Sequence, residues 1–410
     1  METLTNLATR RSWRADKLSH LGSSIFAEVA KWKQEALQAG KQVIDLGIGS
    51  PDRGPSISIR EHLSSEVLKE DNYSYPGTTG TAEFRDQCAA WMSYRFGVQV
   101  NPDTEILALM GSQDGLSHLA QAICNPGDIA IVPDPGYPIY TGSLAIAGVT
   151  PWLVPLKEEQ GFLPDLNSIP EDVWERAVFI LLNIPGNPAA AQADLPFFEA
   201  LVDKAKKHGV LIVHDMAYSE LVFDGGRSLS VLQVHGAKDV AVELHSFSKS
   251  FNMAGCRIGF LTGNPEAVAS LREFKDNIDY GVFKPIQSAA AAALKEAMAG
   301  AEAGNEAASL YESRRDVLVA ALAEAGWEVQ KPCATMFLWA KLPPAFLQRD
   351  QPWSSRRFAR ELLLKTGVAV IPGDAFGSEG EGFVRIALVQ EEQVLREAAR
   401  RIGSFLNEFA

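Results

Sequence analysis

Short apolar runs that end in polar residues recur through the middle of the chain. Residues 177–182 and 210–213 are apolar at every position, a composition typical of strands buried on both faces of a parallel sheet. Such runs alternate with amphipathic segments between about residues 104 and 261, and one of these segments, residues 195–207, is closed by Gly209. The alternation predicts an α/β core in which helices connect parallel strands.

The pattern changes after about residue 291. A helical stretch with alanine-rich and charged positions extends to about residue 325. Strand patterns follow at residues 327–329, 336–340, 368–371 and 383–389. We therefore expect a large domain over residues 50–290 and a smaller α+β domain made of residues 1–49 and 291–410.

Composition and charge exclude several classes of function. The chain has 410 residues, 46% of them hydrophobic, and its net charge of −13 opposes binding to nucleic acid or to an anionic membrane surface. No apolar run approaches the roughly 20 residues of a membrane-spanning helix, and residues 1–17 lack the apolar core of a signal peptide. Cys88, Cys124, Cys256 and Cys333 have no metal-binding spacing, so we expect no metal site and a reducing, cytoplasmic location.

Lys249 stands in a polar segment directly after the apolar run 240–244. Ser246 and Ser248 precede it, and Arg257 follows. An amine on the loop that leaves a buried strand can form a Schiff base with an aldehyde, and the hydroxyls and the guanidinium can bind a phosphate dianion. Pyridoxal 5'-phosphate (PLP) fits this combination. The segment alone also allows an exposed lysine in an ordinary polar loop.

Asp215 ends the apolar run that begins at Val210. A carboxylate there can keep the pyridine nitrogen of PLP protonated, although a helix N-cap is the alternative explanation. Tyr218 follows three residues later, and Asn187 lies in the segment after residues 177–182. Both side chains can donate a hydrogen bond to the ring oxygen O3'.

Ser112 and Gln113 open an amphipathic helix after the strand pattern at residues 105–110. Backbone N–H groups at a helix start bind anions, so we expect the PLP phosphate here. Tyr137 lies in the proline-rich turn 133–138, where its ring can stack on the pyridine ring. An ordinary loop with a core tyrosine is the alternative for this turn.

In their order along the chain, these segments resemble the class I aminotransferases of PLP fold type I, from about Ser24 to the C-terminus. The resemblance implies a mostly parallel seven-stranded sheet between helices in the large domain. It also implies Lys249 as the Schiff-base lysine, Asp215 on the ring nitrogen, Asn187 with Tyr218 on O3', and Ser112, Gln113, Ser246, Ser248 and Arg257 on the phosphate. Residues 46–52, 133–138 and 277–283 are most similar to the LL-diaminopimelate aminotransferase group.

Two positions depart from the family pattern. The usual Asn-Pro-Thr-Gly turn has alanine at residues 189 and 190, which removes a hydroxyl and a glycine beside Asn187. Gln113 stands where many diaminopimelate enzymes have lysine, which removes a positive charge near the phosphate or a distal substrate carboxylate. PLP chemistry is unaffected in principle, but no position of the sequence identifies the amino donor.

Arg385 is the one charged residue in the strand pattern 383–389. A buried guanidinium is costly unless an anion meets it, so we expect it to bind a substrate α-carboxylate, with a structural ion pair as the alternative. Gly49, in a turn after residues 43–46, can bring the backbone to the same carboxylate or simply form a tight turn. Asn187 completes the expected substrate contacts.

Tyr75 lies in residues 73–80, which the pattern alone describes as a turn with two exposed tyrosines. In the family that the chain resembles, a tyrosine of this segment reaches the phosphate of the neighbouring subunit. The resemblance therefore implies a homodimer with composite active sites.

The expected activity is a ping-pong transamination from an L-amino acid to a 2-oxo acid, either 2-oxoglutarate or pyruvate. Lys249, Asp215 and Tyr218 are the expected catalytic residues, and LL-diaminopimelate, aspartate and alanine are candidate donors. A carbon-sulfur β-lyase of the same fold is one alternative. A non-catalytic PLP-sensing regulatory module is another, although it would need a DNA-binding unit. A sugar aminotransferase is disfavoured because it has no use for Arg385.

Overall fold

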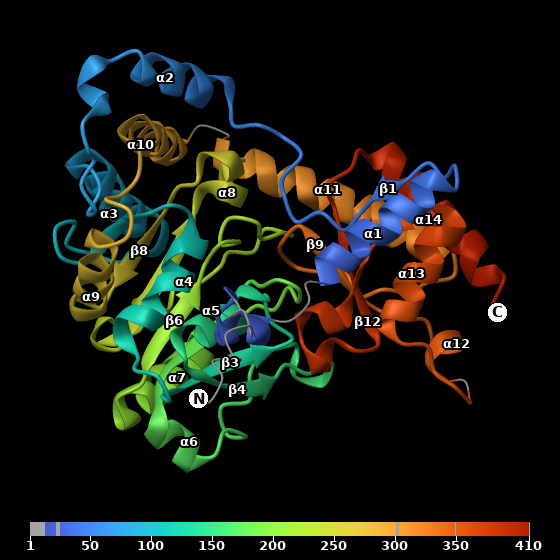
Figure 1. The fold of residues 1–410 in the computed structure, drawn as a ribbon. Helices are drawn as coiled ribbons and strands as arrows, with labels where there is room; N and C mark the ends of the chain where they lie inside the picture. The colour runs from blue at the N-terminus through green and yellow to red at the C-terminus, as the bar shows by residue number, and fades with distance from the viewer. Residues whose placement is uncertain (1–12, 22–24, 301–302, 349, 410) are drawn as a thin grey trace, which may run out of the picture.

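The apolar runs in the middle of the chain form one central sheet (Figure 1). This computed structural model describes residues 13–21, 25–300, 303–348 and 350–409, and within them the sheet has seven strands in the order β2-β8-β7-β6-β5-β3-β4. Neighbouring strands from β4 to β7 are parallel, whereas β8 is antiparallel to both β7 and β2. The mostly parallel seven-stranded α/β fold is confirmed. The strands are β2 (Ile106–Leu109), β3 (Ile129–Asp134), β4 (Thr150–Pro155), β5 (Ala177–Leu182), β6 (Leu211–Asp215), β7 (Ala241–Ser246) and β8 (Gly259–Gly263).

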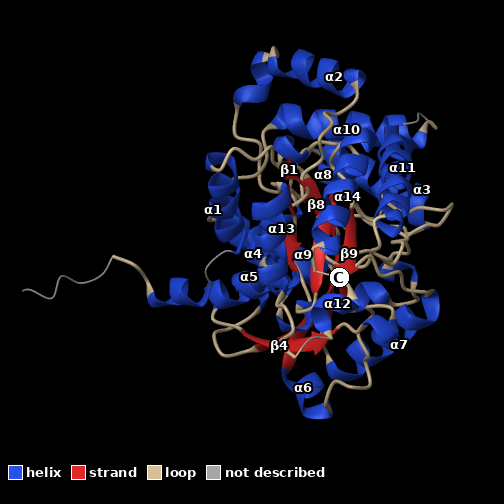
Figure 2. Ribbon diagram, turned by 90° about the vertical axis from the view of Figure 1, so that its right-hand side faces the viewer, coloured by secondary structure: helices blue, strands red, loops and turns tan. Residues whose placement is uncertain are grey.

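Helices cover both faces of this sheet, as Figure 2 shows. One face packs against α4 (Ser112–Ile123), α5 (Ile139–Ala147) and α9 (Pro265–Asp276), and the other against α3 (Ala82–Phe96), α7 (Leu195–His208) and α10 (Lys284–Met298). Adjacent residues of one strand enter opposite cores, because side chains alternate along a strand. Ile212 thus packs on the α7 side and Val213 on the α4 side. The remaining helices are α1 (Ile25–Gln38), α2 (Ile57–Val67), α6 (Glu171–Arg176), α8 (Phe247–Ser250), α11 (Ala303–Glu324), α12 (Pro344–Leu347), α13 (Ser355–Thr366) and α14 (Glu392–Asn407).

The two ends of α7 illustrate how the local sequence determines where a helix begins and ends. Asp194 caps its start by accepting a hydrogen bond from the Phe197 N–H, and Gly209 ends it in the left-handed conformation, at φ 69°. The predicted stop at Gly209 is confirmed.

A separate core lies in the C-terminal part of the chain, at the right of Figure 1. Its antiparallel sheet has the order β11-β12-β9, and β1 pairs in parallel with β10. This pairing brings the N-terminal segment onto the C-terminal part. The domain boundaries themselves stay a prediction. The strands are β1 (Ile44–Asp45), β9 (Phe337–Lys341), β10 (Val368–Ala369), β11 (Ile371–Pro372) and β12 (Phe383–Ala387).

The prediction of a strand at residues 327–329 is wrong. These residues follow α11 without entering a sheet. Trp327 is nevertheless buried, packs edge-on against Phe358 and donates its indole N–H to the Lys341 carbonyl. Trp327 is therefore apolar because it packs in the core, and not because it belongs to a strand.

Within the described residues, no helix has both the length and the apolar character needed to cross a membrane.

Candidate active site

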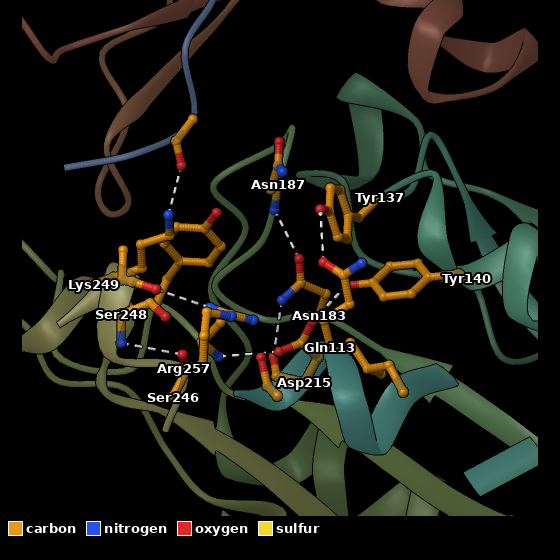
Figure 3. A pocket seen from close by; sticks show the side chains of 16 residues that line it. Gln113, Tyr137, Tyr140, Asn183, Asn187, Asp215, Ser246, Ser248, Lys249 and Arg257 are labelled. Carbon is orange, nitrogen blue, oxygen red and sulfur yellow. Dashed lines mark hydrogen bonds between the residues drawn. The ribbon is translucent and has the colours of Figure 1, made fainter. Parts of the chain in front are cut away.

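The carboxyl ends of β5, β6 and β7 meet the start of α4 at one cavity (Figure 3). Parallel strands that end at the same sheet edge bring their following residues together, which is where α/β folds place ligands. Eleven of the predicted site residues line this cavity: Gly49, Ser112, Gln113, Tyr137, Asn187, Asp215, Tyr218, Ser246, Ser248, Lys249 and Arg257.

The start of α4 has the form of an anion cradle. Gly111 precedes it at φ 78°, and a Cβ at Gly111 would lie 2.5 Å from Nη2 of Arg257. Only glycine lets the guanidinium pass this close to the first turn. Ser246 and Ser248 lie beside it, and the Ser246 hydroxyl accepts a hydrogen bond from the Ser248 N–H at 3.2 Å. The helix start, the two hydroxyls and the guanidinium suit a phosphate dianion.

Lys249 lies in the four-residue helix α8 and not in a loop, which corrects the expectation from sequence. Its Nζ donates a hydrogen bond to the Gly49 carbonyl at 2.5 Å. Burial, together with repulsion from the guanidinium groups of Arg385 and Arg257, lowers the pKa of this amine to about 8. About a tenth of the amine is therefore neutral, and nucleophilic, at pH 7, a far larger fraction than for an ordinary lysine.

Asp215 is buried at the end of β6 and faces the cavity. One oxygen accepts a hydrogen bond from the Tyr140 hydroxyl at 2.9 Å, and the other accepts one from the Ala217 N–H at 3.1 Å. The second contact closes a turn, and no helix directly follows Asp215 in the described residues, so the N-cap alternative does not explain this residue. Burial raises the pKa of this carboxyl, so a cationic partner in the cavity would relieve the cost of its charge.

Two asparagines and a tyrosine form the wall between β5 and β6. Asn183 donates to the Asp215 carbonyl at 2.8 Å and accepts from the Asn187 N–H at 2.8 Å. Tyr218 is buried, which raises the pKa of its hydroxyl above the ordinary value and keeps it a hydrogen-bond donor.

Arg385 is 2% exposed and lies behind Asn187 and Gly49. It donates to Asn187 Oδ1 at 2.9 Å and to the Gly47 carbonyl at 2.8 Å, and its Nε is buried without a hydrogen-bond partner. Burial lowers the pKa of this guanidinium to about 10. No acidic side chain among the described residues pairs with Arg385, so the structural ion pair is not its explanation.

The chain matches a known family over most of its length. A profile of the family described as aminotransferase class I and II matches residues 41–402. The chain belongs to this family. It is 42% identical over 390 residues to an LL-diaminopimelate aminotransferase of Nitratidesulfovibrio vulgaris, an alignment that covers 95% of this chain and 98% of the relative.

Solved structures agree with the family assignment. A substrate-bound BacF structure from Bacillus subtilis superimposes with a TM-score of 0.89 at 35% identity, covering 96% of this chain and 98% of that one. A probable N-succinyldiaminopimelate aminotransferase from Thermus thermophilus gives a TM-score of 0.85 at 38% identity, covering 93% and 100%. The chain is therefore a class I aminotransferase that moves an amino group between an amino acid and a 2-oxo acid. Neither the β-lyase nor the sensing module is favoured.

The cofactor of this aminotransferase is pyridoxal 5'-phosphate, and the described residues fit it. The cradle at α4 suits its phosphate, the buried Asp215 suits a protonated ring nitrogen, and the partly neutral Lys249 suits its aldehyde. When bound, the pyridine ring supplies an electron sink for the α-carbon of the substrate.

Sequence reasoning missed three contributors to the aminotransferase site. Tyr140 lies one helical turn after Tyr137, a spacing that could have drawn attention to it. Asn183 is a polar residue directly after the buried strand β5, much as Asp215 is the polar last residue of β6. Gly47 contributes only a carbonyl oxygen, for which a sequence carries no signal.

Tyr75 does not line the cavity. It is 85% exposed, and its ring lies 5.5 Å from that of Tyr280. Its contact with a neighbouring subunit stays a prediction.

Proposed function

We propose that this aminotransferase takes its amino group from an L-α-amino acid whose α-carboxylate binds Arg385. The observation that carries the proposal is the buried guanidinium with neutral partners and an unpartnered Nε. Such a group is costly to bury, and a carboxylate supplies both the charge and the acceptors that it lacks. Gly49 connects this group to the amine, because its carbonyl accepts from Lys249 while its Cα lies beside Arg385.

The other side chains then have distinct tasks. Lys249 would hold the cofactor through its aldehyde, and its amine, once freed by the substrate amine, would move the α proton of the substrate. Asp215 holds the proton of the ring nitrogen, with Tyr140 orienting the carboxylate. Tyr218 and the Asn187 amide would donate to the ring oxygen, and Tyr137 would stack on the ring. Ser112, Gln113, Ser246, Ser248 and Arg257 bind the phosphate.

The donor class follows from the relatives. The names of the Nitratidesulfovibrio vulgaris and Thermus thermophilus proteins both refer to diaminopimelate, which makes LL-diaminopimelate the first donor to test. Aspartate and alanine are the others, with 2-oxoglutarate or pyruvate as the acceptor.

We further propose that the enzyme works as a cytoplasmic homodimer in which Tyr75 contacts the partner's phosphate. The exposure of Tyr75 supports the homodimer, because large exposed aromatic side chains are typical of interfaces. All four cysteines are free, which suits a reducing compartment.

A half-reaction without acceptor tests the proposed function. Holoenzyme is mixed with one donor at a time, and the 2-oxo acid released per subunit is measured. We expect one equivalent from at least one of LL-diaminopimelate, aspartate and alanine, and a second turnover only after 2-oxoglutarate or pyruvate is added. Continuous release of ammonia with the 2-oxo acid, or no release from any amino acid, would reject the proposal.

A further inference from the structure

Lys275 is a buried lysine of α9 that lies outside the cavity. Its side chain is 0% exposed, and its Nζ lies 2.5 Å from Asp114 Oδ2 and 2.5 Å from Asp279 Oδ2. An ammonium group is buried only where it is paired, so the two carboxylates account for its position.

The same contacts explain an acidic cluster. Asp114, His118 and Asp279 have ligand atoms within 4.8 Å of one another, a spacing that suits a metal ion. The Lys275 ammonium already contacts both carboxylates and supplies the positive charge. We therefore describe the cluster as an ion-pair network.

One end of this network holds the phosphate cradle. Asp114 is the third residue of α4, and its Oδ2 also accepts a hydrogen bond from the Met110 N–H at 2.9 Å. Met110 and Gly111 form the turn from which Ser112 and Gln113 present their N–H groups. The carboxylate that Lys275 binds thus closes the turn that carries the anion site.

The other end holds the segment that carries Tyr75. Asp279 Oδ1 accepts a hydrogen bond from the Gly281 N–H at 2.8 Å. Gly281 has a φ of 97°, and a Cβ there would lie 2.4 Å from the Gly77 carbonyl oxygen. Next to it, the Tyr280 ring packs on Tyr75. Residues 279–281 are therefore packed directly against residues 75–78.

We propose that Lys275 is a positioning residue that ties the phosphate-binding turn of its own subunit to the Tyr75 segment that serves the partner subunit. This proposal rests on the homodimer and the Tyr75 contact of the proposed function. Without the ammonium, the buried carboxylate of Asp114 and the partly buried one of Asp279 repel each other, and the turn at residues 110–112 separates from residues 279–281. Each cradle then loses its own geometry as well as the tyrosine that the other subunit contributes.

The first test compares PLP with pyridoxal, which lacks the phosphate. In the full-length protein, Lys275→Met keeps the length of the side chain and removes its charge. We expect the Kd of PLP to rise roughly 10- to 100-fold and that of pyridoxal to stay unchanged, because pyridoxal does not use the cradle. The control is Lys295→Met, which removes an exposed ion pair with Glu83 and should change neither Kd. Equal losses for PLP and pyridoxal would make Lys275 merely structural and overturn the proposal.

Asp279→Asn is a second variant that disturbs folding less, because its amide oxygen can still accept from the Gly281 N–H. It weakens only the Tyr75 side of the network. We expect a smaller rise in the Kd of PLP, of roughly 3- to 10-fold, again without effect on pyridoxal. An unchanged Kd of PLP would show that Asp279 does not link Lys275 to the Tyr75 segment.

Mixed dimers test the link between subunits. One subunit carries Lys249→Ala, which silences its site, together with Lys275→Met, and its partner is wild type. The one active site then keeps its own Lys275 but receives Tyr75 from the altered subunit. Against a mixed dimer with Lys249→Ala alone, we expect a roughly 3- to 10-fold higher PLP concentration for half-maximal transamination. Equal values would overturn the link between subunits while leaving the proposed dimer standing. A monomeric active enzyme would instead reject the dimer itself and this inference with it.

Discussion

At the residue scale, we predict that Lys249 sets the pH dependence of cofactor loading. Burial and the nearby guanidinium groups lower the pKa of its amine to about 8, so the neutral form prevails above that pH and the ammonium form below it. We predict that the rate at which apoenzyme bonds PLP rises with pH through an inflection near 8. Stopped-flow absorbance over pH 6 to 10 measures it. An inflection near the ordinary lysine pKa of about 10.4 would contradict this account.

Lys249 is also expected to be the single lysine that bonds the cofactor. Borohydride reduction of the yellow holoenzyme should fix the label on Lys249, as peptide mapping by mass spectrometry can establish. Lys249→Ala should still bind PLP through its phosphate but lose transamination by a factor of about 10⁴ or more, since both nucleophile and proton carrier are gone. A label on another lysine would rule out the assignment.

Asp215 can be separated from its orienting partner by mutation. Asp215→Asn should lower kcat/KM roughly 100-fold, because a charge-assisted hydrogen bond of about 3 kcal/mol is lost. Tyr140→Phe should cost less, roughly 10-fold, since it removes only the hydroxyl that donates to Asp215. Steady-state kinetics with one donor measure both, and wild-type rates in Asp215→Asn would remove Asp215 from the mechanism.

The site residues that could be predicted from the sequence are those whose side chains have a distinctive chemistry. Lys249, Asp215 and Arg257 were expected at the cofactor and line one cavity. Gly47 and Tyr140 were not expected. The first acts through its backbone, and the second acts only because the fold brings it to Asp215.

At the element scale, the start of α4 depends on one glycine. Gly111→Ala places a methyl group 2.5 Å from the Arg257 guanidinium, so we predict weaker PLP binding by roughly 10- to 100-fold. Gly97→Ala is the matched control. Gly97 also has a positive φ, of 69°, but its Cβ would meet nothing within 4 Å. It should lower the free energy of unfolding by about 1 to 2 kcal/mol and leave PLP binding unchanged. Equal effects of both variants on PLP would refute the role of the cradle.

Element prediction succeeded where periodicity and burial agree, as in β5 and β6. It failed where an apolar residue is buried without a strand, as at Trp327. The single strand predicted at residues 368–371 is two short strands in the structure. The chain pairs with β1 up to Ala369 and with β12 from Ile371. Apolar composition predicts both halves but not the change of partner.

At the scale of the whole molecule, the main prediction is a homodimer in which each subunit contributes Tyr75 to the active site of its partner. If Tyr75 contacts the partner's phosphate, Tyr75→Phe should weaken PLP binding roughly 10-fold without changing the dimer. Analytical ultracentrifugation with PLP titration measures both quantities. An active monomer, or unchanged PLP binding, would contradict the composite site.

Sequence could predict the fold class and the family of the whole chain, because ordered motifs and alternating elements span most of it. The substrate side chain was beyond reach. Arg385, the residue expected to bind the substrate, would meet the α-carboxylate that every α-amino acid has, and Gln113 and residues 189–190 depart from the family pattern.

The central claim is that this aminotransferase recognises amino acids through Arg385. The most direct measurement is the single-turnover half-reaction of wild type and Arg385→Lys with L-alanine and with ethylamine, which lacks the carboxylate. Lysine keeps the charge but not the planar fork, so kcat/KM for alanine should fall roughly 30- to 1000-fold, the equivalent of about 2 to 4 kcal/mol. Reaction with ethylamine and PLP binding should stay nearly the same. Equal losses with alanine and ethylamine would make Arg385 structural and contradict the claim.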